Sequence, residues 1–237
     1  IHITMILVTN IAGGLMKTLL VTGGAGFIGS HLIKWLSTHN PSYIVINVDL
    51  LTYAGNLSNL DFIDENDHYH FIKGDIADKN LMSQVFDTYQ IDMVINLAAE
   101  SHNDRSIEGP DVFIRTNIVG TQVLLDVAKE AWTLGLDENG YPEFKDNVKF
   151  LQVSTDEVYG ALGPNGYFTE TSPLMPSSPY AASKASADLL VAAYYRTYKM
   201  PICITRSSNN FGLNQYPEKL IPLMIEKAIK NKPLPVY

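Results

Sequence analysis

The 237-residue sequence predicts an α/β fold, a doubly wound parallel sheet with helices on both faces. Short apolar runs rich in Val, Ile and Leu alternate with longer amphipathic stretches, which is the pattern of repeated strand–helix–strand units. A glycine-rich turn joins the first apolar run to the first amphipathic stretch, as a tight βα connection requires. No internal repeat or low-complexity segment interrupts the alternation.

Six apolar runs are expected to be buried strands, because they are too short for helices and are bounded by turn residues. They cover residues 18–22, 43–49, 70–74, 93–98, 149–154 and 202–207. The amphipathic stretches between and after them are expected to be helices, over residues 27–38, 79–89, 112–132, 179–198 and 219–230. Two segments break the alternation: residues 134–147 are polar and predict a surface loop, and residues 160–178 are too rich in proline and glycine for regular structure.

Composition and charge exclude several kinds of partner. The net charge of −8 gives an overall field that repels nucleic acid and anionic membranes, so neither is expected as a partner. Cys203 is the single cysteine, which rules out an internal disulfide framework and fits a cytoplasmic protein. Residues 1–15 lack the basic start and the cleavage site of a signal peptide, and we expect them to be an extension without function that precedes Met16.

The glycine-rich turn at residues 23–29, GGAGFIG, predicts a dinucleotide site. Glycines let backbone N–H groups approach a pyrophosphate at a helix N-terminus. Asp49 ends the next strand, where a carboxylate accepts hydrogen bonds from ribose hydroxyls and repels a 2′-phosphate, so NAD is favoured over NADP. Asp75 follows the third strand and could bind the adenine amine, while Ala98 and its neighbour leave room for the cofactor. The alternatives are a simple tight turn and solvated strand ends.

Two pieces of proton chemistry lie close together in the sequence. Tyr180 and Lys184 are four residues apart on one predicted helix, and the ammonium is expected to lower the pKa of the phenol. The phenolate can then take a proton from a hydroxyl while the carbon gives hydride to nicotinamide. Asp156 and Glu157 end an apolar strand, where a simple dehydrogenase needs no acid pair. The pair therefore indicates oxidation used as a means to another reaction, although adjacent acids are often only a solvated loop.

These residues give the chain a resemblance to the extended short-chain dehydrogenase/reductases, and within them to the dTDP-glucose 4,6-dehydratases. The matching motifs are GGAGFIG at 23–29, AAESH at 98–102, DRSI at 104–107, STDEVYG at 154–160, YAASKASAD at 180–188, SNNFG at 208–212 and YPEKLIPL at 216–223. The resemblance runs from about Met16 to the end of the chain. Asn103 departs from it, since the family usually has valine there, as does the pair Leu213 and Asn214, which replaces a proline–aromatic pair. Family members also continue well past Tyr237.

The resemblance implies a Rossmann-type NAD-binding domain over residues 16–207 and the start of a smaller substrate-binding domain over residues 208–237. It implies a homodimer that shares a bundle of the helices at 112–132 and 179–198. Thr155 would bind the sugar C4 oxygen, Asp156 would act as acid and Glu157 as base, with Tyr180 and Lys184 at the oxidation step. The implied NAD contacts are Gly23, Gly26, Phe27, Ile28, Gly29, Asp49, Thr52, Asp75, Ile76, Ala98, Ala99, Thr116, Tyr180, Lys184 and Asn210. The implied substrate contacts are Ser101, Thr155, Asn209, Lys219 and Leu220.

The implied reaction is a redox-neutral dehydration of a nucleotide sugar, with dTDP-glucose as the expected substrate. NAD is the expected cofactor, and no metal is expected, because no other His or Cys is spaced to join His102. One alternative is another extended short-chain enzyme, a nucleotide-sugar epimerase or decarboxylase, against which the acid pair argues. A second is a non-catalytic NAD-binding sensor, which would not need Thr155, Tyr180 and Lys184 together, and a third is an inactive truncated product.

Overall fold

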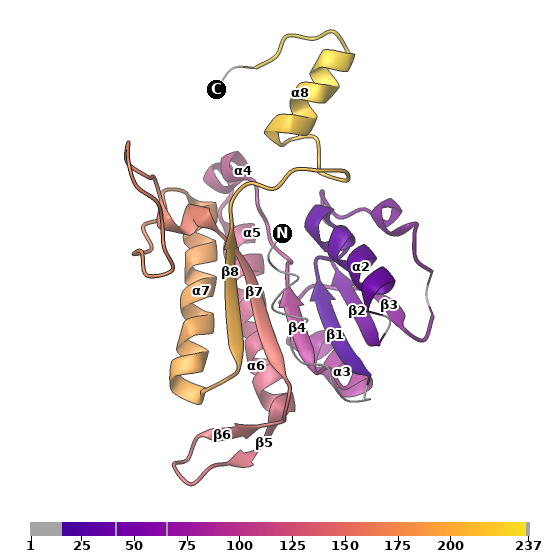
Figure 1. The fold of residues 1–237 in the computed structure, drawn as a ribbon, viewed down its shortest axis with the longest axis vertical. Coiled ribbons are helices and arrows are strands. Elements are labelled where there is room, and N and C mark those ends of the chain that lie inside the picture. The colour runs from indigo at the N-terminus through magenta and orange to yellow at the C-terminus, as the bar shows by residue number, and fades with distance from the viewer. Residues whose placement is uncertain (1–15, 41, 65, 236–237) are drawn as a thin grey trace.

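The computed structural model describes residues 16–40, 42–64 and 66–235, so the expectation for residues 1–15 lies outside the described residues. In the described chain, six parallel strands form one sheet in the order β3-β2-β1-β4-β7-β8 (Figure 1). Their bounds are β1 Lys17–Thr22, β2 Tyr43–Asp49, β3 Tyr69–Lys73, β4 Met93–Asn96, β7 Lys149–Thr155 and β8 Ile202–Ser207. The doubly wound parallel sheet predicted from the sequence is confirmed.

The strand order reverses between β1 and β4. Thr22, the last residue of β1, pairs with Val48 of β2 on one side and with Asn96 of β4 on the other. At such a reversal the loops that leave neighbouring strands diverge to opposite faces of the sheet, which opens a crevice at the carboxyl ends of the strands. The fold therefore places a ligand site above β1 and β4.

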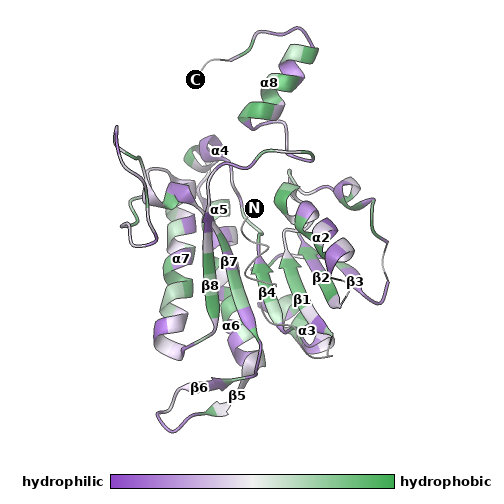
Figure 2. Cartoon of the chain, in the orientation of Figure 1, coloured by the Kyte–Doolittle hydropathy of each residue, from purple (hydrophilic) through white to green (hydrophobic). Residues whose placement is uncertain are grey.

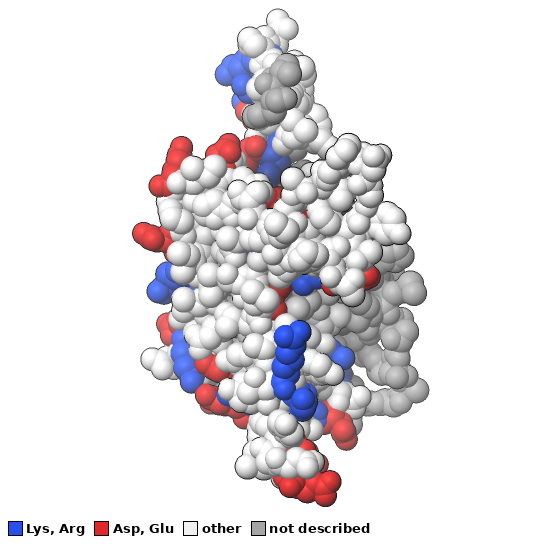
Figure 3. All heavy atoms as spheres, turned by 90° about the vertical axis from the view of Figure 1, so that its left-hand side faces the viewer, with Lys and Arg blue, Asp and Glu red and all other residues white. Residues whose placement is uncertain are grey.

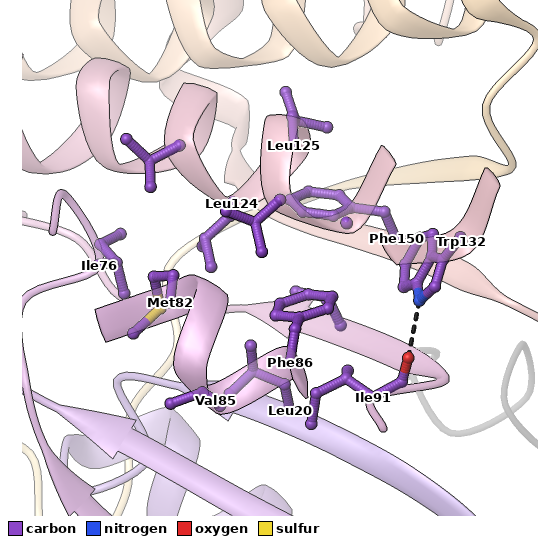
Figure 4. Close-up of a cluster of buried hydrophobic side chains, with 14 of the residues drawn as sticks. Leu20, Ile76, Met82, Val85, Phe86, Ile91, Leu124, Leu125, Trp132 and Phe150 are labelled. Atoms are coloured by element: carbon purple, nitrogen blue, oxygen red, sulfur yellow. Dashed lines mark hydrogen bonds between the residues drawn. The ribbon is translucent and has the colours of Figure 1, made fainter. Parts of the chain in front are cut away.

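Helices cover both faces of the sheet. Helix α2, Phe27–His39, packs Ile33 and Leu36 against β1 residues on one face. Helices α3 (Lys79–Tyr89), α6 (Thr121–Trp132) and α7 (Pro179–Tyr198) pack on the other. Figure 4 shows this second core, where the indole of Trp132 donates to the carbonyl of Ile91 at 2.7 Å. The one polar group of this buried ring therefore has a partner.

Burial on both faces explains the sequence pattern of the strands. Strands covered on two sides read as continuous apolar runs rather than as alternating ones, and Figure 2 shows the central strands as hydrophobic along their length. Helix α8, Leu220–Ile229, is also apolar, yet none of its residues is buried. It stands apart from the sheet beyond the carboxyl ends of the strands (Figure 1).

The predicted surface loop at residues 134–147 is wrong. Strands β5 (Thr133–Leu136) and β6 (Pro142–Phe144) form an antiparallel hairpin there. The Asp137 carboxylate accepts the backbone N–H groups of Asn139 and Tyr141, both at 2.8 Å, and so fixes the turn. The polar composition that suggested a loop is that of a short hairpin exposed to solvent.

The single helix predicted over residues 112–132 contains a change of winding. A short helix α5 (Asp111–Phe113) leads into a π-helical segment η2 (Ile114–Gly120) and then into α6. Such π segments are frequent at functional sites, because they redirect side chains without breaking the helix. Three short elements have no counterpart in the prediction, namely η1 (Leu57–Leu60), α4 (Asn103–Glu108) and η3 (Asp156–Tyr159).

Candidate active site

One cleft of about 610 Å³ opens at the carboxyl ends of the strands. The sequence-predicted residues that line it are Gly23, Gly26, Phe27, Ile28, Gly29, Asp49, Thr52, Asp75, Ile76, Ala98, Ala99, Ser101, Thr116, Thr155, Glu157, Tyr180, Lys184, Asn209, Asn210, Lys219 and Leu220. Asp156 is the predicted site residue that does not line it. Residues predicted from motifs far apart in the sequence therefore meet in one place.

The glycine loop makes one wall of this cleft, and its backbone runs too close to its neighbours for side chains. Gly23 has a φ of +70°, and a Cβ on it would lie 2.8 Å from the Cα of Ala98. A Cβ on Gly29 would overlap the Gly23 carbonyl oxygen. Glycine is thus required at both positions, and the loop leads directly into the N-terminus of α2. The cradle suits a phosphate group, because it presents backbone N–H groups and no side chain.

The carboxylate of Asp49 organises the same wall. Its Oδ2 accepts the backbone N–H of Ala25 at 2.9 Å, and its Oδ1 accepts that of Leu51 at 2.8 Å. Burial raises the pKa of Asp49, and these two hydrogen bonds partly oppose that rise. The side chain therefore joins the glycine loop to the end of β2 and also lines the cleft. Asp75, predicted beside it, lines the cleft too, but its Oδ2 forms an ion pair with Arg115 at 2.8 Å.

A buried polar network fixes the strand ends on the floor of the cleft. Thr22 donates to the Asn96 side-chain oxygen at 2.7 Å, and Asn96 donates to Gln152 at 2.8 Å and to Thr121 at 3.1 Å. The amide N–H of Ala98 donates to the Thr22 hydroxyl at 3.2 Å. Because a buried polar group without a partner is costly, such a network holds β1, β4 and β7 in one register.

The acid pair lies directly after β7, where the chain turns into the 3-10 helix η3. Thr155 caps this helix, since its hydroxyl oxygen accepts the backbone N–H of Glu157 at 3.2 Å. The cap turns the Glu157 side chain to the cleft, where its Oε2 accepts a hydrogen bond from Asn103 at 2.9 Å. Asp156 lies beside Thr155 but outside the cleft wall.

Tyr180 and Lys184 are one turn apart near the start of α7, and both line the cleft. The expected lowering of the Tyr180 pKa by Lys184 is wrong. Burial and the nearby Glu157 carboxylate raise the pKa of Tyr180, and a hydrogen bond with Thr155 opposes this only in part. The ammonium of Lys184 instead donates to the backbone carbonyl of Val153 at 2.6 Å. Lys184 therefore ties α7 to β7 through this hydrogen bond.

The buried ammonium of Lys184 should leave a pH signature on stability. Burial lowers the pKa of Lys184 from 10.5 to about 8, and the charge of Asp188 limits the fall. Between these values the unfolded chain holds the proton and the folded chain does not, so the free energy of unfolding should rise with pH across this window. The contribution is about 3 kcal/mol, since each pKa unit is worth about 1.4 kcal/mol. Denaturant unfolding of wild type and Lys184→Met across this range measures it, and a rise of equal size in both proteins would contradict the assignment.

The segment after β8 closes the top of the cleft. It crosses the carboxyl ends of the strands before it enters α8 (Figure 1). Lys219 donates to the Ser101 carbonyl at 2.8 Å, and the Tyr53 hydroxyl donates to Glu218 at 3.0 Å. Glu218 also lies 3.7 Å from His102. These contacts explain how residues predicted as substrate contacts, far along the chain, reach the cofactor wall.

Several residues of the site stand in the quoted motifs or beside them but were given no contact with cofactor or substrate. Glu100, Asn103, Tyr216 and Glu218 line the cleft. Asn117 is buried in the π segment, where its amide donates to the Glu100 carbonyl at 3.0 Å and its oxygen accepts the Glu100 N–H at 3.0 Å. In the sequence Asn117 is one of several polar residues of its helical run, with Arg115 and Thr116 directly before it, and nothing there reveals a partner 17 residues away.

The described residues contain neither a cluster of metal ligands nor a helix that could span a membrane. No three His, Cys, Asp or Glu side chains in residues 16–40, 42–64 and 66–235 lie together as a metal site requires. In the same part of the chain, no helix is both long and apolar enough to cross a membrane.

The fold and the cleft define a Rossmann-type α/β protein with the side chains of an oxidoreductase-like site. Residues 20–237 match the family model described as GDP-mannose 4,6 dehydratase. The chain belongs to this family of sugar-nucleotide dehydratases, which confirms the resemblance drawn from the motifs.

Similar proteins support the family assignment. The chain is 51% identical to the dTDP-glucose 4,6-dehydratase of Xanthomonas campestris pv. campestris (strain B100) over 94% of its own length and 61% of that protein's length. A dTDP-glucose 4,6-dehydratase from Streptomyces venezuelae, crystallised with NAD and TYD bound, is 45% identical with a TM-score of 0.83, over 93% of this chain and 65% of that one. The UDP-glucuronic acid 4-epimerase of Bacillus cereus, in complex with UDP-glucuronic acid and NAD, is 30% identical with a TM-score of 0.80, over 93% and 66%. The chain thus spans about three fifths of the length of the X. campestris relative.

Proposed function

We propose that the complete gene product is an NAD-dependent nucleotide-sugar 4,6-dehydratase that converts dTDP-glucose to dTDP-4-keto-6-deoxyglucose. The observation that carries the proposal is the meeting of Tyr180, Thr155 and Glu157 in one cleft with the glycine loop. An oxidation site alone needs no carboxylate beside the phenol, and here Glu157 lines the same cleft as Tyr180 and its charge raises the pKa of that phenol. The identity to named dTDP-glucose 4,6-dehydratases supports this substrate.

The residues of the first wall suit NAD. The glycine cradle at Gly23 and Gly29 would hold the pyrophosphate, Asp49 the ribose hydroxyls, and the small Ala98 and Ala99 would leave room for the rest of the cofactor. The remaining NAD contacts proposed from the motifs are Gly26, Phe27, Ile28, Thr52, Asp75, Ile76, Thr116, Tyr180, Lys184 and Asn210. NAD when bound supplies the hydride acceptor for C4 of the sugar and the hydride donor for C6.

The chain's own residues would move the protons. Tyr180 accepts the proton of the C4 hydroxyl when it is ionised to the phenolate, a form that its raised pKa makes scarce at neutral pH, while the Thr155 hydroxyl binds the C4 oxygen. The ketone at C4 makes the C5 proton acidic, and Glu157 removes it. The electron pair forms the C5–C6 double bond as the C6–O bond breaks, and the hydroxyl leaves as water with a proton from Asp156. Glu157 then returns the proton to C5.

The role of Asp156 rests on the resemblance alone, because in the structure this carboxylate does not line the cleft. Its Oδ1 accepts a hydrogen bond from the Thr155 hydroxyl at 3.4 Å. Ser101, Asn209, Lys219 and Leu220 line the same cleft and are proposed to hold the nucleotide sugar.

A labelled substrate tests the proposed function. Deuterium placed on C4 of dTDP-glucose should be recovered on C6 of the same product molecule, in unlabelled solvent. An epimerase would return the label to C4, and a non-catalytic NAD-binding protein would leave the substrate unchanged. Either result, read by mass spectrometry and NMR of the product, would overturn the proposal.

Asp49 should make the protein selective for NAD. A 2′-phosphate would bring like charge to a carboxylate that is 8% exposed, so NAD should bind at least about tenfold more tightly than NADP. Calorimetry of the cofactor-free protein with each dinucleotide measures the ratio. Asp49→Asn should reduce it, whereas Asp75→Asn, which changes a carboxylate paired with Arg115, should keep it. Equal affinities in the wild type would remove this role from Asp49.

The proposed assembly is a homodimer. Figure 3 shows the side of the molecule that carries α7 as largely uncharged. The exposed apolar residues of α5, η2 and α7 are Val112, Ile114, Val119, Leu189 and Tyr195. A second copy of the chain would cover them, since large exposed apolar patches mark interaction surfaces. Light scattering of the complete gene product tests this state.

The division of the chain and its location are also proposals. Residues 16–207 would form the NAD-binding domain and residues 208–237 the start of the substrate-binding domain, which the isolation of α8 from the core supports. The single cysteine supports the cytoplasm as the location.

A further inference from the structure

The side chain of Asn103 is hydrogen-bonded at both ends of its amide. It lies at the first position of α4, half-buried in the cleft wall. Its Nδ2 donates to Oε2 of Glu157 at 2.9 Å, and its Oδ1 accepts from the Ser178 hydroxyl at 2.8 Å. Among the described residues, no other side chain hydrogen-bonds the Glu157 carboxylate.

Ser178 extends this contact to the helix that carries Tyr180. Its hydroxyl oxygen caps α7 by accepting the backbone N–H of Ala181 at 3.1 Å. The Ser178 hydroxyl hydrogen is then free to donate to the side-chain oxygen of Asn103. The amide oxygen of Asn103 therefore faces Ser178, and its nitrogen faces Glu157. Ser178 therefore donates to Asn103 and Asn103 donates to the Glu157 carboxylate, so that a chain of hydrogen bonds links the start of α7 to Glu157.

The backbone of Asn103 is held as firmly as its side chain. The hydroxyl of Ser106, which is fully buried, donates to the Asn103 carbonyl at 2.6 Å. The amide thus bridges three elements, α4, η3 and α7, from a fixed base. A valine, the usual residue at this place in the family that the sequence resembles, could make neither side-chain bond.

We propose that Asn103 is a positioning residue for the C5 proton transfer, an inference that rests on the proposed function. It holds the Glu157 carboxylate in one orientation and couples it to the turn of α7 that carries Tyr180. The groups proposed to act at C4 and at C5 are then placed by one hydrogen-bonded chain. Without the bond, the carboxylate can rotate away from the C5 proton while the oxidation at C4 proceeds as before.

The test compares Asn103→Val with wild type in the complete gene product. We expect kcat for dehydration, and exchange of the C5 proton with deuterated solvent, to fall about tenfold, the value of a hydrogen bond to a charged group. KM should be unchanged, and a sugar oxidised at C4 with its C6 hydroxyl intact should accumulate. In a Glu157→Gln background, Asn103→Val should add little further loss, because the carboxylate it positions is gone.

Glu108→Gln is the control, since it changes an exposed side chain of the same helix α4 that lies outside the cleft. It should keep the wild-type rate of C5 exchange. Wild-type C5 exchange in Asn103→Val, an equal loss in Glu108→Gln, or an equal loss at the C4 oxidation would overturn this inference alone. A wild-type enzyme that does not carry deuterium from C4 to C6 would overturn the proposed function and the inference with it.

Discussion

Replacing Glu157 by glutamine should stop the reaction after the sugar has been oxidised at C4. The amide has the size of the carboxylate but cannot take the C5 proton, so dehydration should fall by about 10²–10⁴. A sugar that has lost two hydrogens but kept its C6 hydroxyl should accumulate, and its C5 proton should not exchange with solvent. Quenching the reaction at short times and weighing the nucleotide sugar by mass spectrometry measures this intermediate.

The same variant should change how the first step depends on pH. Burial and the Glu157 charge both raise the pKa of Tyr180, so removing the charge should shift the pH dependence of C4 oxidation to lower pH. Glu108→Gln is a suitable control, because it removes an exposed acid at the end of α4 outside the cleft. Glu157→Gln that dehydrates at the wild-type rate would show that another group removes the C5 proton.

The sheet and the cofactor wall were predictable because their cause is local. Buried parallel strands must be apolar on both faces, and a glycine such as Gly23 is required wherever the backbone adopts a positive φ. Both constraints act on residues that are consecutive in the chain, so the sequence shows them directly.

The contacts that tune the site were not predictable in this way. Asn103 reaches Glu157 from 54 residues away, and Ser178 reaches Asn103 from 75 residues away. The spacing of Tyr180 and Lys184 predicts a lowered pKa for the phenol, but the ammonium donates to a backbone carbonyl of β7 instead. Helical spacing places two side chains on one face, yet tertiary packing decides what each one contacts.

The hairpin β5–β6 and the position of Asp156 show a second limit. The hairpin is exposed and polar, so its residues carry no hydrophobic period that separates a short strand from a loop. Asp156 and Glu157 are adjacent in the sequence, but in the turn of η3 only the second lines the cleft. Which of two neighbouring acids faces a ligand depends on the winding after the strand, and the motif alone does not give it.

Tyr180→Phe should block the reaction before any change in the sugar. The variant keeps the ring, which packs edge-on against Phe113 with centroids 6.4 Å apart, so the fold and the cofactor wall should be preserved. It removes the hydroxyl that accepts the C4 proton, and C4 oxidation should fall by about 10²–10⁴. No oxidised sugar should be trapped, and neither C5 exchange nor dehydration should be detected. This separates Tyr180→Phe from Glu157→Gln, in which the oxidised sugar accumulates.

Tyr195→Phe supplies the matched control on the same helix, since this tyrosine is 55% exposed and lies outside the cleft. Tyr195→Phe should form the same intermediate and the same product as wild type, each at the wild-type rate. A double variant, Tyr180→Phe with Glu157→Gln, should behave as Tyr180→Phe alone, because the second proton transfer needs the ketone that the first one creates. Oxidised sugar formed at the wild-type rate by Tyr180→Phe would mean that the C4 proton leaves by another route, for which the Thr155 hydroxyl, hydrogen-bonded to Tyr180, is the candidate.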